Sequence, residues 1–387
     1  GLQFYLNDIS PIGITVQTMV ADFLDFRNDG GVVAGRLALR PLKMTEIPIL
    51  SKVSIGGLYA RDLNQYAPAR EWDYTMNGPE DDVDQDGIQD GPWAEDYIYQ
   101  ITGDSLTGAE RETAIAKGLY DSLIEHKDQW ASRTDDPFSI AGVDIGVPII
   151  SSKLVGLDVY GQLGITVDNA EKDDSVETEG WGIGAPGVQL RAGPLLARLE
   201  YRRTQGYFEP GYFGSYYLEE RLTRNPIMPK EQLLDSTTLN GLFGTLGFDI
   251  AGFLSLTGTY QRMMGQDTET ETWIGETDTV SYSIEPMDQR FEATAGVGQT
   301  LLERIPKITK AEAFFYKTRI QQTIMKYDSN TGLPKVNANN KPYFDKFFQK
   351  SPNTYWGYRL GAEVLPGSMI MWETRYGWKF DNNYELV

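Results

Sequence analysis

The stretch from Lys153 to Asp168, KLVGLDVYGQLGITVD, decides the fold. Apolar residues and glycine occupy every second position from Val155 to Val167, and polar residues, tyrosine and glycine fill the positions between them. Successive side chains of a β-strand point to opposite faces, so this pattern predicts a strand with one apolar and one polar face. It lasts more than ten residues, whereas strands in soluble proteins are usually ~5–6 residues long.

The same alternation recurs along the chain and predicts about fourteen strands in total. The others are expected at residues 2–6, 12–26, 32–42, 52–61, 140–147, 180–190, 194–203, 239–250, 253–263, 290–299, 308–320, 355–365 and 370–380. From Lys52 onward, short connections alternate with long polar ones. The short ones are residues 148–152, 191–193, 250–252, 304–307 and 366–367, and the long ones are 64–136, 168–178, 204–238, 265–289 and 322–354. Tight turns are also expected at residues 7–11 and 28–31.

Composition excludes several classes of protein. The 387 residues include no Cys and one His, and they carry a formal net charge of -20. A chain without Cys has no disulfide, thiolate metal site or Cys nucleophile. The acidic balance argues against a nucleic-acid partner, which requires a basic face. No apolar run long enough for a membrane helix is present.

Long two-faced strands with strictly alternating short and long connections resemble Gram-negative outer-membrane β-barrel proteins. The resemblance implies an all-β, antiparallel up-and-down transmembrane barrel with short periplasmic turns, long extracellular loops and outer-membrane lipid around it. Residues 1–62 and 137–387 would supply strands, and residues 63–136 would form an extracellular insertion. A soluble β-sandwich remains the alternative, because its strands also alternate. The length of the strands and the concentration of charge on one face favour the membrane barrel over the soluble sandwich.

Aromatic residues gather near the predicted strand ends, as in the girdles of membrane barrels. They are Tyr5, Phe23, Phe26, Tyr59, Trp181, Tyr201, Tyr260, Tyr355, Trp356, Trp378 and Phe380. The polar face repeatedly carries charge of both signs. The residues expected to line the lumen are Arg36, Arg40, Asp144, Asp158, Arg198, Glu200, Arg202, Asp249, Arg262, Glu292, Glu312, Arg359, Glu363, Glu373 and Arg375. They could surround a water-filled pore or pair with one another in a filled interior.

The alternation of connections also predicts where the two ends of the chain lie. If residues 366–367 and 7–11 are periplasmic turns, both ends are extracellular. The resemblance implies instead that complete barrels keep both termini in the periplasm and end on an aromatic residue, whereas this chain ends Tyr384-Glu385-Leu386-Val387. We therefore hypothesise that the sequence is a segment of a larger barrel. Pairing between the first and last strands would contradict this.

The insertion contains a motif of the form D-x-D-x-D-G-x-x-D. Alternate carboxylates can converge on one calcium ion while Gly87 allows a sharp turn. The candidate metal ligands are Asp82, Asp84, Asp86, Ile88 and Asp90. The motif resembles the acidic repeats of thrombospondin type 3, but Trp93 stands where an EF-hand has Glu. The alternative is a solvated acidic loop.

An amphipathic helix is expected at residues 107–129, because Ile115, Leu119 and Leu123 recur every four residues. It could pack on its own loop or on a partner protein. His126 lies on this helix without a Ser beside it, and no phosphate-binding or zinc-protease motif is present, so we expect no enzyme. Two functions remain. One is a structural anchor or platform for surface or periplasmic proteins, and the other is a porin-like channel for polar solutes.

Overall fold

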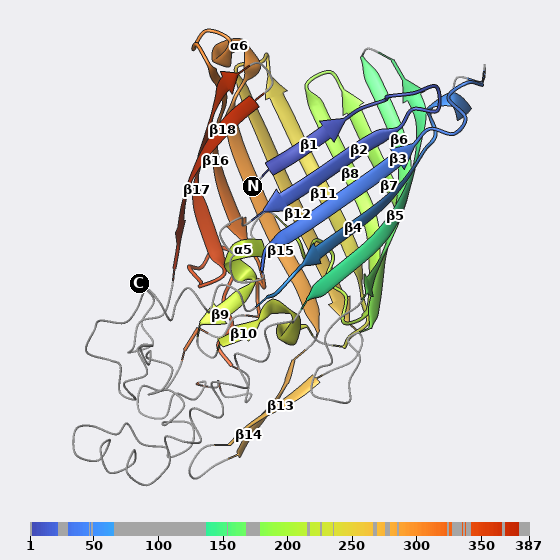
Figure 1. Ribbon diagram of the computed structural model, residues 1–387. Coiled ribbons are helices and arrows are strands. Elements are labelled where there is room, and N and C mark those ends of the chain that lie inside the picture. The colour runs from blue at the N-terminus through green and yellow to red at the C-terminus, as the bar shows by residue number, and fades with distance from the viewer. Residues whose placement is uncertain are drawn as a thin grey trace, which may run out of the picture.

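The computed structural model describes residues 2–21, 30–45, 47, 49–65, 137–152, 154–167, 179–214, 217–224, 227–234, 236–265, 269–274, 279–284, 286–322, 325–326, 335, 337, 342–365 and 368–378. Fourteen strands form one antiparallel sheet, in the order β1-β2-β3-β4-β5-β6-β7-β8-β11-β12-β15-β16-β17-β18. Each strand therefore lies beside its neighbours in the chain, which confirms the up-and-down arrangement. Figure 1 shows that the sheet curls, with β1 and β18 at its two edges.

The strands of the sheet agree closely with the predicted ones. They are β1 (Leu2–Leu6), β2 (Thr15–Ala21), β3 (Val32–Leu39), β4 (Ser54–Asp62), β5 (Phe138–Ser151), β6 (Val155–Val167), β7 (Gly180–Ala192), β8 (Leu195–Gly206), β11 (Leu239–Ile250), β12 (Leu254–Gly265), β15 (Met287–Val297), β16 (Ile308–Lys317), β17 (Thr354–Leu365) and β18 (Ser368–Gly377). The expected turn at residues 148–152 is mostly wrong, because β5 continues to Ser151. Strand β16 ends at Lys317 and not at Ile320.

Several short elements lie within the long connections or turns. The pairs β9 (Leu222–Arg224) with β10 (Ile227–Pro229) and β13 (Glu269–Ile274) with β14 (Thr279–Ile284) form two separate hairpins. The short helices are α5 (Tyr217–Glu220), α6 (Gln299–Leu302), η2 (Leu50–Lys52) and η3 (Lys230–Leu233). Within the described residues, no helix is long and apolar enough to cross a membrane. The expected helix at residues 107–129 and the first two residues of the turn at 28–31 lie outside the described residues.

The register gives the sheet two chemically different faces. Residues paired across neighbouring strands share a face, and one face carries exposed apolar side chains, such as Leu246 and Trp372 with 61% and 68% of their surface exposed. The other face is polar and concave. Arg36 of β3 reaches Asp144 of β5 across the intervening strand β4. Gly56 of β4 leaves the space for this pair, because a Cβ there would lie 2.5 Å from the Asp144 carboxylate.

The two edge strands point in the direction that the alternation predicts. Leu2 pairs with Val20, and Gly377 pairs with Tyr355, so β1 begins and β18 ends on the side of the long connections. In the part of the chain that the structure describes, β1 pairs only with β2 and β18 only with β17. The turn at Pro366–Gly367 lies outside this part.

Candidate functional site

The concave face brings together all but one of the charged residues expected to line a lumen. Cross-strand pairing places them on the face of Glu200, and Arg40 follows the same alternation one residue after β3. Arg262 is the exception, and its assignment to the lumen was wrong. It pairs with Leu242, so its exposed side chain lies on the apolar face.

Many charges on the concave face are neutralised by partners of opposite sign. Arg36 donates to Asp144 with a separation of 2.7 Å between Nη2 and Oδ1. Arg191 of β7 lies 2.9 Å from the carboxylate of Asp158 on β6. Because the partners belong to different strands, these pairs link strands side by side as well as balancing charge.

The most buried group of this kind surrounds Glu200 of β8. Its carboxylate has no exposed surface and lies between the guanidinium groups of Arg198 and Arg202, at 2.7 and 2.6 Å. Tyr160 and Gln162 of β6 also donate to it, at 2.8 and 2.9 Å. A buried carboxylate has no water to bond, so it needs hydrogen-bond donors from the protein. Glu200 has four such donor residues.

A second group joins the last three strands of the sheet. Arg359 of β17 bonds Glu312 of β16 at 3.1 Å and Glu373 of β18 at 2.6 Å. Arg375 also bonds Glu373, and Lys310 lies 2.9 Å from Glu312. Two carboxylates and three cations thus form one connected network along this part of the concave face.

The connection between β8 and β11 packs against the concave face at the end that bears the long connections. We call residues 207–234 the inward connection. Phe208 lies over Gly164 and Gly182, where a Cβ on Gly182 would lie 2.3 Å from the ring. Farther along, the ring of Tyr212 packs against Phe138 of β5 with centroids 4.2 Å apart. The buried aromatic and aliphatic residues of this region form the hydrophobic cluster of the described chain.

A fully buried ion pair fixes the inward connection to β4. Arg221 Nε lies 2.6 Å from Asp62 Oδ2, and neither side chain is exposed. The same guanidinium donates from Nη2 to Asp62 Oδ1 and to the carbonyl oxygen of Asn64, at 2.7 and 2.6 Å. Tyr217 donates to Asp62 at 2.7 Å. A buried ion pair needs further hydrogen bonds to offset its loss of water, and Tyr217 and the Asn64 carbonyl oxygen supply two of them here.

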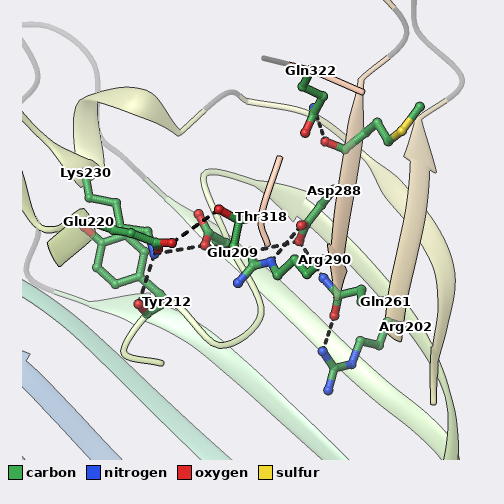
Figure 2. Close-up of polar contacts among 11 residues, drawn as sticks. Arg202, Glu209, Tyr212, Glu220, Lys230, Gln261, Asp288, Arg290, Thr318 and Gln322 are labelled. Carbon is green, nitrogen blue, oxygen red and sulfur yellow. Dashed lines mark hydrogen bonds and ion pairs between the residues drawn. The ribbon is translucent and has the colours of Figure 1, made fainter. Parts of the chain in front are cut away.

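Glu209 connects the inward connection to β15, as Figure 2 shows. Its carboxylate lies 3.1 Å from Lys230 Nζ and 2.6 Å from Arg290 of β15. Burial favours the neutral acid, but Arg290 and Lys230 outweigh it and lower the pKa of Glu209 to about 2. Lys230 also bonds Glu220 at 2.8 Å, and Arg290 bonds Asp288 at 2.8 Å.

The tyrosines of the inward connection stay neutral. Burial raises the pKa of both Tyr212 and Tyr217 well above their ordinary value. Tyr212 donates its hydroxyl proton to Gln65 at 2.8 Å, and Gln65 donates to Glu231 at 2.8 Å. The inward connection is therefore held by a continuous set of polar contacts around an aromatic cluster.

This arrangement binds segments of the chain to one another. Within the described ranges, no group of three or more His, Cys, Asp or Glu residues is arranged to hold a metal ion. The candidate calcium ligands Asp82, Asp84, Asp86, Ile88 and Asp90, and also His126, lie outside those ranges. Calcium binding at residues 82–90 stays a prediction.

Sequence reasoning missed the residues that hold the inward connection. Asp288 and Arg290 follow the alternation of Glu292 on β15, and this signal could have identified them. Asp62 is the last residue of β4 and also follows the pattern of its strand. Arg221 and Lys230 lie in a long polar connection, where no periodic signal distinguishes one charged residue from the next.

No family model, no curated protein and no solved structure matches this chain.

Proposed function

We propose that this protein is an outer-membrane β-barrel protein that serves as a structural anchor or platform for surface or periplasmic proteins. Its long strands carry an exposed apolar face that suits lipid, and every long connection leaves the sheet at the same end. A membrane strand needs about 9–11 residues, which most strands from β5 onward reach or exceed. The apolar face contacts lipid, and the long connections project outside the cell.

One observation supports an anchor over a channel. The inward connection is packed against the concave face by the buried Arg221–Asp62 pair and by Glu209 with its two cations. Charges along the concave face are also paired with each other. Ions crossing a channel require accessible polar groups, whereas these groups already satisfy one another.

The insertion gives this platform its strongest external charge. Residues 66–136 carry more than half of the net negative charge of the chain. With calcium bound at Asp82, Asp84 and Asp86, the segment would present a less acidic surface to a partner protein. Isothermal titration with calcium tests this, and an Asp84→Asn/Asp86→Asn variant should abolish the binding heat.

The alternative is a porin-like channel, which the two signs of charge on the concave face favour. Conductance in planar bilayers separates the two functions. The refolded protein should shift its gel mobility on heating, remain in membranes at high pH and give no steady current steps. Steady open-channel steps from the intact chain would support the channel and contradict the anchor. A water-soluble protein without a heat-dependent shift would contradict the membrane assignment itself.

A further inference from the structure

The charged residues on the apolar face are all basic and all lie at one end of the sheet. Within its fourteen described strands, cross-strand pairing leaves four charged residues on this face. They are Arg61, Arg203, Arg262 and Lys317. Each lies where its strand leads into a long connection. The chain has 55 acidic and 35 basic residues, so a random placement would favour carboxylates.

A segment of the β16–β17 connection crosses the apolar face at this end. We call residues 342–351 the outer strap. Lys317 holds it, because its Nζ donates to the carbonyl oxygens of Lys346 and Gln349, both at 2.7 Å, and lies 2.8 Å from Asp345. The ring of Phe347 packs against Tyr260 and Phe291, with centroid separations of 6.2 and 5.2 Å. Both partners of Phe347 belong to the apolar face.

The outer strap presents an aromatic ring and two cations to its surroundings. Phe348 has 94% of its surface exposed. Lys346 and Lys350 on either side of it are also exposed. Lys350 Nζ lies 3.9 Å from the ring centre of Trp378, and Trp378 contacts Trp356 with centroids 5.1 Å apart.

Two arginines extend this basic region along the strands. Arg262 follows Tyr260 by two residues on the same face, so it lies beside the ring of Tyr260 that Phe347 covers. Arg203 lies two strands away on β8, a separation of about 10 Å at the usual strand spacing. Both side chains are exposed. Within the described residues, neither arginine has an ion-pair partner.

Resting on the proposed membrane location, we propose that Arg203, Arg262, Lys346 and Lys350 bind the phosphate groups of anionic lipid headgroups, while Phe348 inserts at the boundary with the acyl chains. The order along the apolar face is aliphatic side chains, then aromatic rings, then cations. A lipid matches this order, because its chains, glycerol region and phosphate follow the same sequence. An acidic protein segment would meet the cations but would leave the aliphatic surface uncovered.

The test uses the full chain in a neutral detergent, titrated with phosphatidylglycerol or with phosphatidylcholine of the same acyl chains, and read by native mass spectrometry. The variants Arg203→Gln/Arg262→Gln and Lys346→Gln/Lys350→Gln each remove two cations. Lys52→Gln/Arg304→Gln removes the same charge from the short-turn end and is the matched control. A cation near an anionic lipid surface contributes about a fivefold gain in affinity, so each double variant should bind phosphatidylglycerol about 25-fold more weakly.

The proposal requires that phosphatidylglycerol bind more tightly than phosphatidylcholine, and that the control variant keep this preference. Equal binding of the two lipids, or an equal loss in the control, would overturn it. Inorganic phosphate provides a further arm. If it displaced phosphatidylglycerol at equal concentration, the site would recognise free anions and the lipid assignment would be wrong. Heat-dependent gel mobility is measured on every variant. A variant that loses this shift no longer folds as a barrel, which bears on the proposed function, whereas a variant that keeps the shift and loses phosphatidylglycerol binding bears on the lipid site.

Discussion

The replacement Arg221→Leu tests whether the buried ion pair holds the inward connection in place. The Asp62 carboxylate is fully buried, and this change removes the only cation that pairs with it among the described residues. Breaking a buried pair by removing one partner costs about 3–5 kcal/mol. The inward connection should therefore detach about 140- to 3,700-fold more often, since 1.4 kcal/mol is a factor of ten.

Hydrogen exchange followed by mass spectrometry measures this opening directly. Amides of residues 207–224 should exchange faster by that factor, while amides of β12 should keep their protection. Lys43→Leu is the matched control, because Lys43 pairs with Asp8 at 2.7 Å in an exposed turn. Exposed pairs contribute about 0–1 kcal/mol, so the control should change little. Wild-type exchange in Arg221→Leu would refute the reasoning. The double variant Asp62→Leu/Arg221→Leu should recover part of the loss, because no unpaired charge remains.

Three further predictions concern the inward connection and the two faces. Gly182→Ala should destabilise the inward connection by about 1–3 kcal/mol, because a Cβ there would lie 2.3 Å from an aromatic ring. Gly258→Ala should have little effect, since nothing lies within 4 Å of its Cβ; hydrogen exchange compares the two. The pKa of Glu209 is lowered from 4.5 to about 2, so its contribution is complete above pH 4.5 and is lost as the pH falls toward 2. Protease cleavage of the inward connection should rise over that range, and Glu209→Gln should remove the dependence. Leu246→Arg places a charge on the apolar face and should cost about 2–4 kcal/mol for folding into bilayers. Thr257→Arg on the concave face should cost much less, and equal costs in denaturant titrations would contradict a lipid-facing surface.

The strands were predictable because their two faces meet different surroundings. In β6 the alternation runs from Val155 to Val167 without interruption, so the sequence alone locates the strand. The expected turn at residues 148–152 shows the limit of this signal. Pro148 favours a turn in sequence, but it lies within β5 beside an irregularity in its pairing with β6. The apolar character of Ile149 and Ile150 could have indicated a longer strand.

The site was predictable only where it belongs to strands. Alternation located the concave charges, although it could not show that Arg36 would pair with Asp144. Arg262 follows Leu254, Leu256 and Tyr260 in the alternation of β12, so a stricter use of the pattern would have placed it on the apolar face. The hairpin β13–β14 was missed, although Glu269–Ile274 alternates weakly. The inward connection has no repeating pattern, because its residues contact five different strands, β4, β5, β6, β7 and β15. Which residues contact the inward connection depends on the curvature of the sheet, and no local sequence pattern predicts that curvature.

The Arg36–Asp144 pair also constrains how the protein reaches its final state. Its partners are 108 positions apart, and residues 66–136 lie between them. Arg36 and Asp144 cannot neutralise each other until β3 and β5, which lie on opposite sides of residues 66–136 in the sequence, are both in the sheet. A sheet of only the first four strands would therefore hold Arg36 without its carboxylate partner. Addition of β5 should be cooperative with the formation of those strands, and few partly folded molecules should accumulate.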